Sequence, residues 1–217
     1  MINDLKLGIK LLKYSSQRTL SIILAIVFFI AGVACAVFFN DNIGYAGLFI
    51  LSNAMWPVQL LYSINASNQV QSSSSKKKLQ TTVPAIMYTG CELILYTFYI
   101  ILQLVVVHLH PEYREMLTLN ILFTGISVFF LAIYTGTAYK YFFVSFVLFL
   151  TTYLAFSMFG NYMRFHTVTL PLSLPVTIIL GYVLVIAGGA LQYMLYVLFY
   201  KRDLSKYAQG AAMRKCM

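Results

Sequence analysis

The chain of 217 residues is 60% hydrophobic and only 10% charged, with a formal net charge of +9. Water-soluble domains carry about 25% charged residues, so this composition excludes an ordinary soluble protein and predicts an all-α integral membrane protein. A basic balance is also typical of nucleic-acid-binding proteins, but no soluble face of this sequence combines basic and aromatic residues. We therefore expect the lipid bilayer, and no nucleic acid, to be the partner of its positive charges.

Residues 1–18 precede every long apolar run and predict an amphipathic helix that lies in the membrane interface. Side chains of each kind recur there at spacings of three and four residues, the spacing of one helix face. The apolar stripe consists of Ile2, Leu5, Ile9 and Leu12, and the basic stripe of Lys6, Lys10 and Lys13. The two stripes lie only about 90° apart at 3.6 residues per turn, so a flexible basic leader is the alternative interpretation.

Six apolar runs follow within residues 19–200, each close to the roughly 20 residues that a helix needs to cross the hydrocarbon of a bilayer. We place the spans at Leu20 to Phe39, Tyr45 to Ile64, Met87 to Val107, Met116 to Thr135, Tyr141 to Phe159 and Leu172 to Tyr200. The fold class expected is therefore six transmembrane helices after an amphipathic interfacial helix. A basic tail, residues 201–217, ends the chain.

The distribution of Lys and Arg gives the expected orientation, because short basic segments are retained on the cytoplasmic side during insertion. With both termini cytoplasmic, only Arg114 and Arg164 of the 15 basic residues fall outside. The inner segments hold Lys6, Lys10, Lys13, Arg18, Lys76, Lys77, Lys78, Lys140, Lys201, Arg202, Lys206, Arg214 and Lys215. This asymmetry predicts a multi-pass membrane protein with six spans and both ends in the cytoplasm.

The cytoplasmic loop at about residues 65–86 is the only long polar interval between two apolar runs in the middle of the chain. It predicts a short helix over Lys76 to Thr81, which Ser75 caps and Pro84 stops. A helix in this place offers a surface that another protein can push on, whereas the alternative is a solvated basic loop that only fixes the topology. The candidate contact residues are Ser75, Lys76, Lys77, Lys78, Leu79, Gln80, Thr81, Thr82, Val83 and Pro84.

Glu92 is the one acidic residue inside a predicted span. A charge at the centre of a bilayer costs at least about 2.5 kcal/mol on insertion scales, so such a residue is a functional candidate. Glu92 also lies within roughly 12 Å of the cytoplasmic loop along a helix. Pairing with a lysine from Lys76 to Lys78, or contact with cytoplasmic water, is therefore the alternative to a role in handling protons or substrate.

Motifs for catalysis and nucleotide binding are missing from the sequence. A P-loop needs a Gly-Lys pair, and the chain has none, nor has it a Gly-x-Ser-x-Gly or His-Glu-x-x-His motif. His108 and His110, near Glu112 and Glu115, come nearest to a metal site, but residues of this kind are common in surface loops. We expect no enzyme activity, no catalytic residue, no metal site and no cofactor in this chain.

The order of parts resembles the membrane subunit of a bacterial ABC-2-type exporter. The resemblance rests on the amino-terminal helix (Asn3 to Gln17), the six spans, the loop Lys76-Lys77-Lys78-Leu79-Gln80-Thr81-Thr82-Val83-Pro84 between the second and third spans, and the short basic tail. Family members carry in that loop a coupling helix, which docks on a separate ATPase chain. They also tend to have a longer outer segment before the sixth span than Gly160 to Pro171.

The resemblance implies an ATP-driven exporter of a hydrophobic or amphipathic substrate, most similar in size to permeases for peptides, bacteriocins and amphipathic toxins. It implies that a cytosolic ABC ATPase binds the ATP and Mg²⁺. It also implies a second membrane subunit, either a second copy or a related chain. The alternative is a non-transporting membrane assembly, immunity or sensor protein, whose loop binds a cytosolic partner without ATP.

Overall fold

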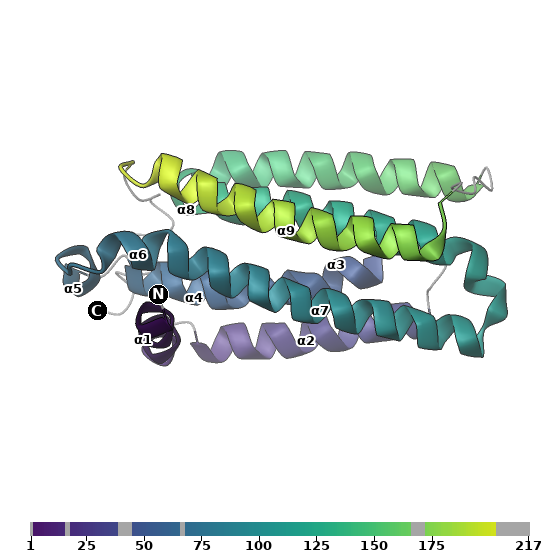
Figure 1. The fold of residues 1–217 in the computed structure, drawn as a ribbon, viewed down its shortest axis with the longest axis horizontal. Helices are drawn as coiled ribbons and strands as arrows, with labels where there is room; N and C mark the ends of the chain where they lie inside the picture. The colour runs from purple at the N-terminus through teal and green to yellow at the C-terminus, as the bar shows by residue number, and fades with distance from the viewer. Residues whose placement is uncertain (1, 16–17, 39–44, 66–67, 166–171, 203–217) are drawn as a thin grey trace.

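The computed structural model describes residues 2–15, 18–38, 45–65, 68–165 and 172–202, and these form a bundle of helices with no strand among them (Figure 1). Two short 3₁₀ turns, Ser52–Ala54 and Pro111–Tyr113, interrupt the α-helices. The α-helices are α1 Ile2–Leu12, α2 Arg18–Phe38, α3 Tyr45–Leu51, α4 Met55–Asn65, α5 Asn68–Gln71, α6 Lys76–Gln80, α7 Thr82–Leu109, α8 Arg114–Phe165 and α9 Leu174–Phe199. The basic tail from residue 203 onward lies outside the described residues.

Five helical segments in the described part are long and apolar enough to cross a membrane. The longest belongs to α8, which has 52 residues and a break at Tyr141, where φ is −128° and ψ is 56°. The rings of Tyr134 and Phe149 lie 5.0 Å apart, whereas 15 residues of straight helix would separate them by about 22 Å. The two arms of α8 therefore fold back on each other. The first arm covers the expected fourth span and the second arm covers the expected fifth span.

The second expected span is one continuous path with an irregular turn in its middle. Pro57 has no N–H to donate to the carbonyl four residues earlier, so the distortion falls at Ser52–Ala54 rather than at Trp56 and Pro57 themselves. Asn53 Nδ2 donates to the carbonyl oxygens of Phe49 and Ile50, both at 2.9 Å. The Asn53 side chain thus adds hydrogen bonds to two backbone carbonyls beside the irregular turn.

Small residues allow α9 to approach its neighbours closely. A Cβ atom at Gly181 would lie 1.7 Å from the Tyr96 hydroxyl on α7, and one at Gly189 would lie 2.1 Å from Thr89 Oγ1. Gly188 meets Ala132 of α8 in the same way, with 3.1 Å between the two Cβ positions. The small-residue content of the sixth predicted span is therefore a packing feature, as is usual for helices that associate in lipid.

The outer surface of α2 and of the second arm of α8 is rich in large apolar side chains. The buried residues of α2 are Ser21, Gly32 and Ala36, while its large aliphatic side chains point outward. Ile30 is 62% exposed, and Phe143 on the second arm of α8 is 77% exposed. Bulky apolar side chains thus cover much of the outer surface as well as the core, an arrangement that suits hydrocarbon surroundings.

Candidate functional site

Basic residues gather at one end of the bundle, where α1, α6, the bend of α8 and the end of α9 meet (Figure 1). We call this region the basic end. Lys77 and Lys78 on α6 are exposed there, and so are Lys201 and Arg202 beyond α9. Arg114 begins α8 at the opposite end. The asymmetry counted along the sequence is therefore also an asymmetry of the folded chain.

The short helix expected in the loop forms, but its two boundary signals act differently from the expectation. Ser75 occupies the N-cap position of α6 without making a capping hydrogen bond through its side chain. Pro84 does not stop α6, which ends at Gln80; it lies in the first turn of α7, which begins at Thr82. Proline is tolerated there because the first N–H groups of a helix have no intrahelical partner.

The α6 helix is fixed to the bundle through its last residues. Leu79 is 2% exposed and packs in one apolar cluster with Leu61 of α4 and Val83 of α7. Asn65 Nδ2 donates to the Leu79 carbonyl oxygen at 2.9 Å, and Thr81 Oγ1 donates to the Lys77 carbonyl oxygen at 2.7 Å. Only the lysine side of α6 is open to a partner, while Leu79, Gln80, Thr81, Val83 and Pro84 are buried.

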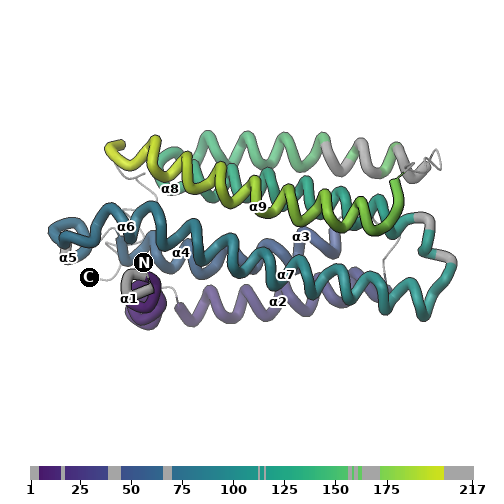
Figure 2. The backbone as a smooth tube through the Cα atoms, in the orientation of Figure 1, coloured from purple at the N-terminus to yellow at the C-terminus, as the bar shows by residue number. Residues whose placement is uncertain are grey.

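The α1 helix packs against this same region, and Figure 2 shows it nearly end-on beside the long helices. Leu5 and Leu12 of the expected apolar stripe contact the cluster around Leu79, but Ile9 is 53% exposed. Gly8 completes the packed face, because a Cβ atom there would lie 2.5 Å from Val83 Cγ1. The lysines of the basic stripe, Lys6, Lys10 and Lys13, are exposed.

Glu92 lies on α7 with no exposed surface, and neither carboxylate oxygen has a hydrogen-bond partner of normal geometry. The sequence left open a pairing with Lys76, Lys77 or Lys78, and no such ion pair is present among the described residues. Tyr88, one turn earlier on the same face, brings the polar group that faces the carboxyl. Glu92 is therefore held inside the bundle, away from the loop lysines.

A set of buried and half-buried polar side chains joins α4, α7, α8 and α9 near Glu92. We call it the polar cluster; it consists of Tyr62, Tyr88, Thr135, Tyr139, Gln192 and Tyr196. Gln192 Nε2 donates to Thr135 Oγ1 at 2.7 Å and to the Tyr196 hydroxyl at 3.1 Å. The Tyr62 hydroxyl donates to the Thr135 carbonyl oxygen at 2.6 Å, and the Tyr62 and Tyr139 rings stack with centroids 4.3 Å apart.

The polar cluster is only partly satisfied. Gln192 Oε1 and the hydroxyls of Tyr88 and Tyr139 are buried without a hydrogen-bond partner. Sequence reasoning did not find this cluster, because its members come from four helices; the available signal was the four-residue spacing of Tyr88 with Glu92 and of Gln192 with Tyr196. Unpaired buried groups are costly, so the unused donors and acceptors of the polar cluster mark it as a candidate site between the four helices.

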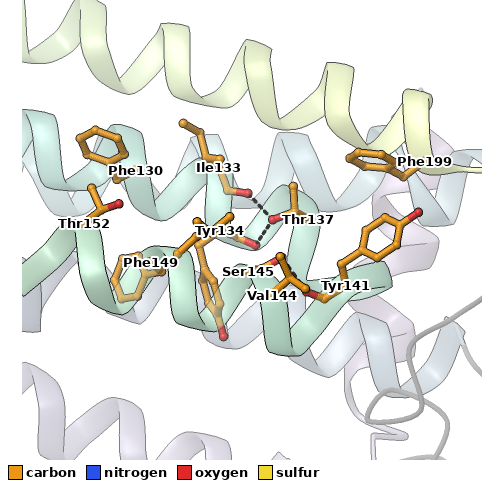
Figure 3. A pocket seen from close by; sticks show the side chains of 11 residues that line it. Phe130, Ile133, Tyr134, Thr137, Tyr141, Val144, Ser145, Phe149, Thr152 and Phe199 are labelled. Atoms are coloured by element: carbon orange, nitrogen blue, oxygen red, sulfur yellow. Dashed lines mark hydrogen bonds between the residues drawn. The ribbon is translucent and has the colours of Figure 1, made fainter.

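An apolar cavity of about 410 Å³ lies between the two arms of α8 and the end of α9 (Figure 3). Its lining includes Phe130, Tyr134, Val144, Phe149 and Phe199. The hydroxyls of the lining residues Thr137 and Ser145 are turned to backbone carbonyls of their own helix. The cavity therefore presents almost only apolar atoms to whatever fills it.

Comparison with known proteins gives no relative: no protein-family model matches the chain, and no curated protein or solved structure matches it. Among the described residues, no group of three His, Cys, Asp or Glu side chains is placed to hold a metal ion. His108 and His110 are exposed at the end of α7, opposite the basic end. The features that carry a functional argument are therefore the exposed lysine side of α6 and the polar cluster behind it.

Proposed function

We propose that this chain is the membrane subunit of an ATP-driven exporter of the ABC-2 type in a bacterial plasma membrane. The observation that carries the proposal is the construction of α6: a short helix with exposed Lys77 and Lys78 whose other side is anchored by the buried Leu79. A surface that is exposed and also firmly attached transmits a push from a docked partner, whereas a solvated loop would absorb it.

The path of this push runs directly into the bundle. Only Thr81 separates α6 from α7, and α7 continues for 28 residues to the opposite end of the molecule. Along α7 lie Tyr88, a member of the polar cluster, and Glu92 beside it. In the proposed cycle, ATP binding closes the partner ATPase, α6 moves with it, and the helices repack around the cluster between two discrete arrangements.

The substrate proposed is hydrophobic or amphipathic, and a peptide is the class that fits the family likeness. Among the described side chains, Glu92 is the only buried acid and no Lys or Arg is fully buried. Such an interior offers little to replace water around a strongly charged substrate. Two membrane subunits, identical or related, would enclose the path between them.

Co-purification in detergent with candidate ATPases from the same organism tests the proposal. Lys77→Glu with Lys78→Glu reverses the charge of the exposed side of α6 and should abolish ATPase retention. The matched control, Lys6→Glu with Lys10→Glu, makes the same charge change on exposed residues of α1 and should retain the ATPase. Leu79→Asp is unsuitable, because Leu79 is buried and its loss would report on folding.

Two results would reject the exporter. If no ATPase binds the native chain, the alternative of a membrane assembly, immunity or sensor protein takes its place. If an ATPase binds equally to the α6 variant and to the α1 control, the partner docks elsewhere and α6 is not the coupling helix.

A further inference from the structure

A second cavity, of about 190 Å³, opens at the basic end between α6, the bend of α8 and the end of α9. Its lining brings together side chains from three parts of the chain. We call it the cationic pocket: Lys76, Lys140, Lys201 and Arg202 supply its positive charges, and Gln71 and Gln80 supply its amides. Lys140 Nζ donates to the Arg202 carbonyl oxygen, which ties the bend of α8 to the end of α9.

The chemistry of the cationic pocket is one-sided. No acidic side chain lines it within the described ranges; Asp203 follows Arg202 in the sequence but lies outside them. Gln80 is 4% exposed, and its Nε2 is a buried donor without a partner. Four cations and an unused amide donor form a site suited to an oxyanion.

The size of the cationic pocket restricts the ligand. A water molecule takes about 30 Å³ of liquid, so 190 Å³ holds a phosphate group with a small ester substituent. It is smaller than the roughly 300 Å³ at which pockets for whole drug-sized molecules begin. A nucleotide would therefore not be enclosed, whereas the headgroup of a larger amphiphile would be.

The neighbouring apolar cavity accounts for the rest of such an amphiphile. Consecutive residues line the two spaces: Lys140 the cationic pocket and Tyr141 the apolar cavity, and on α9 Tyr200 and Phe199 in the same way. The Tyr141 and Phe199 rings, 5.3 Å apart, mark the end of the apolar cavity nearest the cations (Figure 3). An anionic head and an apolar chain thus have adjacent places.

We propose that the basic end binds an anionic phospholipid, with its phosphate in the cationic pocket and an acyl chain in the apolar cavity between the arms of α8. The site shares Lys76 and Gln80 with the candidate contact residues for the ATPase, but lipid retention is measured without an ATPase, so the two proposals can fail separately. The bound lipid would hold α6, α8 and α9 together at the bend at Tyr141. Its phosphate is the group that the cationic pocket recognises.

Lipid retention measured by native mass spectrometry tests the charge of the site. The full-length protein in neutral detergent is mixed with equal amounts of dioleoyl phosphatidylglycerol and dioleoyl phosphatidylcholine. We expect selective retention of the anionic lipid, reduced about tenfold in Lys76→Gln with Lys201→Gln, as for the loss of hydrogen bonds to a charged group. Lys6→Gln with Lys10→Gln is the control that removes the same charge and should change retention less than twofold.

A cavity-filling variant tests the place of the acyl chain. Val144→Trp occupies the apolar cavity, whereas Val183→Trp adds the same bulk to an exposed position of α9 outside it. We expect the first to lower retention of phosphatidylglycerol and the second to leave it unchanged. Isothermal titration with inorganic phosphate, in native protein and both Trp variants, separates a lipid headgroup from a free anion.

Three outcomes would overturn the inference. Equal retention of both lipids would remove the anion selectivity. Equal losses in the pocket pair and the α1 pair would indicate a diffuse surface potential without a built site. Inorganic phosphate binding as tightly as the lipid, unaffected by Val144→Trp, would make the pocket a site for a soluble phosphate.

Discussion

Glu92 is fully buried, although its position eight residues after Pro84 suggested contact with the loop lysines or with cytoplasmic water. Its carboxyl faces the Tyr88 hydroxyl without a hydrogen bond of normal geometry, so an amide of the same shape loses no such bond and avoids the cost of burying an ionisable group. We therefore expect Glu92→Gln to leave the melting temperature unchanged or raise it, as followed by circular dichroism in detergent at pH 7. A fall in melting temperature would show that the carboxyl has a partner.

Gln192 provides the comparison for that measurement, because it is equally buried but donates two hydrogen bonds. Gln192→Leu should lower stability by about 1 to 2 kcal/mol, in keeping with hydrogen bonds between helices in lipid. If Gln192→Leu lowers stability and Glu92→Gln does not, the Gln192 side chain stabilises the bundle and the Glu92 carboxyl does not.

At the scale of the elements, the close contact between α7 and α9 depends on the absence of one methyl group. Gly181→Ala would place a Cβ atom 2.5 Å from Tyr96 Cζ, and the Tyr96 side chain is fully buried and has no free space to move into. We expect a loss of about 1 to 3 kcal/mol, the usual cost of overpacking a core. Thermal unfolding in detergent measures it.

Gly90 on α7 gives the same substitution with the opposite expected sign. A Cβ atom at Gly90 meets nothing within 4 Å, so Gly90→Ala changes only the helix propensity. It should stabilise the helix by up to about 1 kcal/mol. If both alanine variants lose stability equally, the contact of Gly181 with Tyr96 is not the cause.

The positions of the long elements could be predicted from apolar run length alone. The first expected span, Leu20 to Phe39, corresponds to α2, and the sixth, Leu172 to Tyr200, to α9. The start of α7 at Thr82 could not be predicted. From the sequence alone, a proline in the first turn of a helix cannot be distinguished from a proline that ends the preceding helix. The fold-back of α8 also differs from the expected link, since the helix continues through Gly136 to Lys140 before the break at Tyr141.

The candidate site was less predictable than the spans. The sequence predicted a helix over Lys76 to Thr81, and α6 forms there, although Ser75 makes no capping hydrogen bond and Pro84 lies in α7. Which of the α6 side chains faces outward depends on Leu61 and Val83, whose contact with Leu79 no local pattern encodes. The cationic pocket likewise joins Lys76, Lys140 and Lys201, residues that only the fold brings together.

At the scale of the whole molecule, the basic end should face the cytoplasm, because basic segments resist transfer across the membrane. Ser74 lies at this end and His110 at the opposite end, and both are exposed. With Cys35, Cys91 and Cys216 replaced by serine, Ser74→Cys should react with an impermeant maleimide only after cells are opened. His110→Cys should react in intact cells. The reverse pattern would invert the orientation and remove the ATPase from reach of α6.

The single-residue reversal at Tyr141 also bears on how the chain enters a membrane. A long polar linker would let one span wait in the bilayer while the next is still being synthesised. Here the helix runs to Lys140 on one side and resumes directly on the other, with no stretch of polar residues between. The second arm would then be stranded in water with its exposed Phe143, Val144 and Phe146 side chains. The two arms must therefore insert together as a helical hairpin, which makes this bend the position least able to accept an inserted tag.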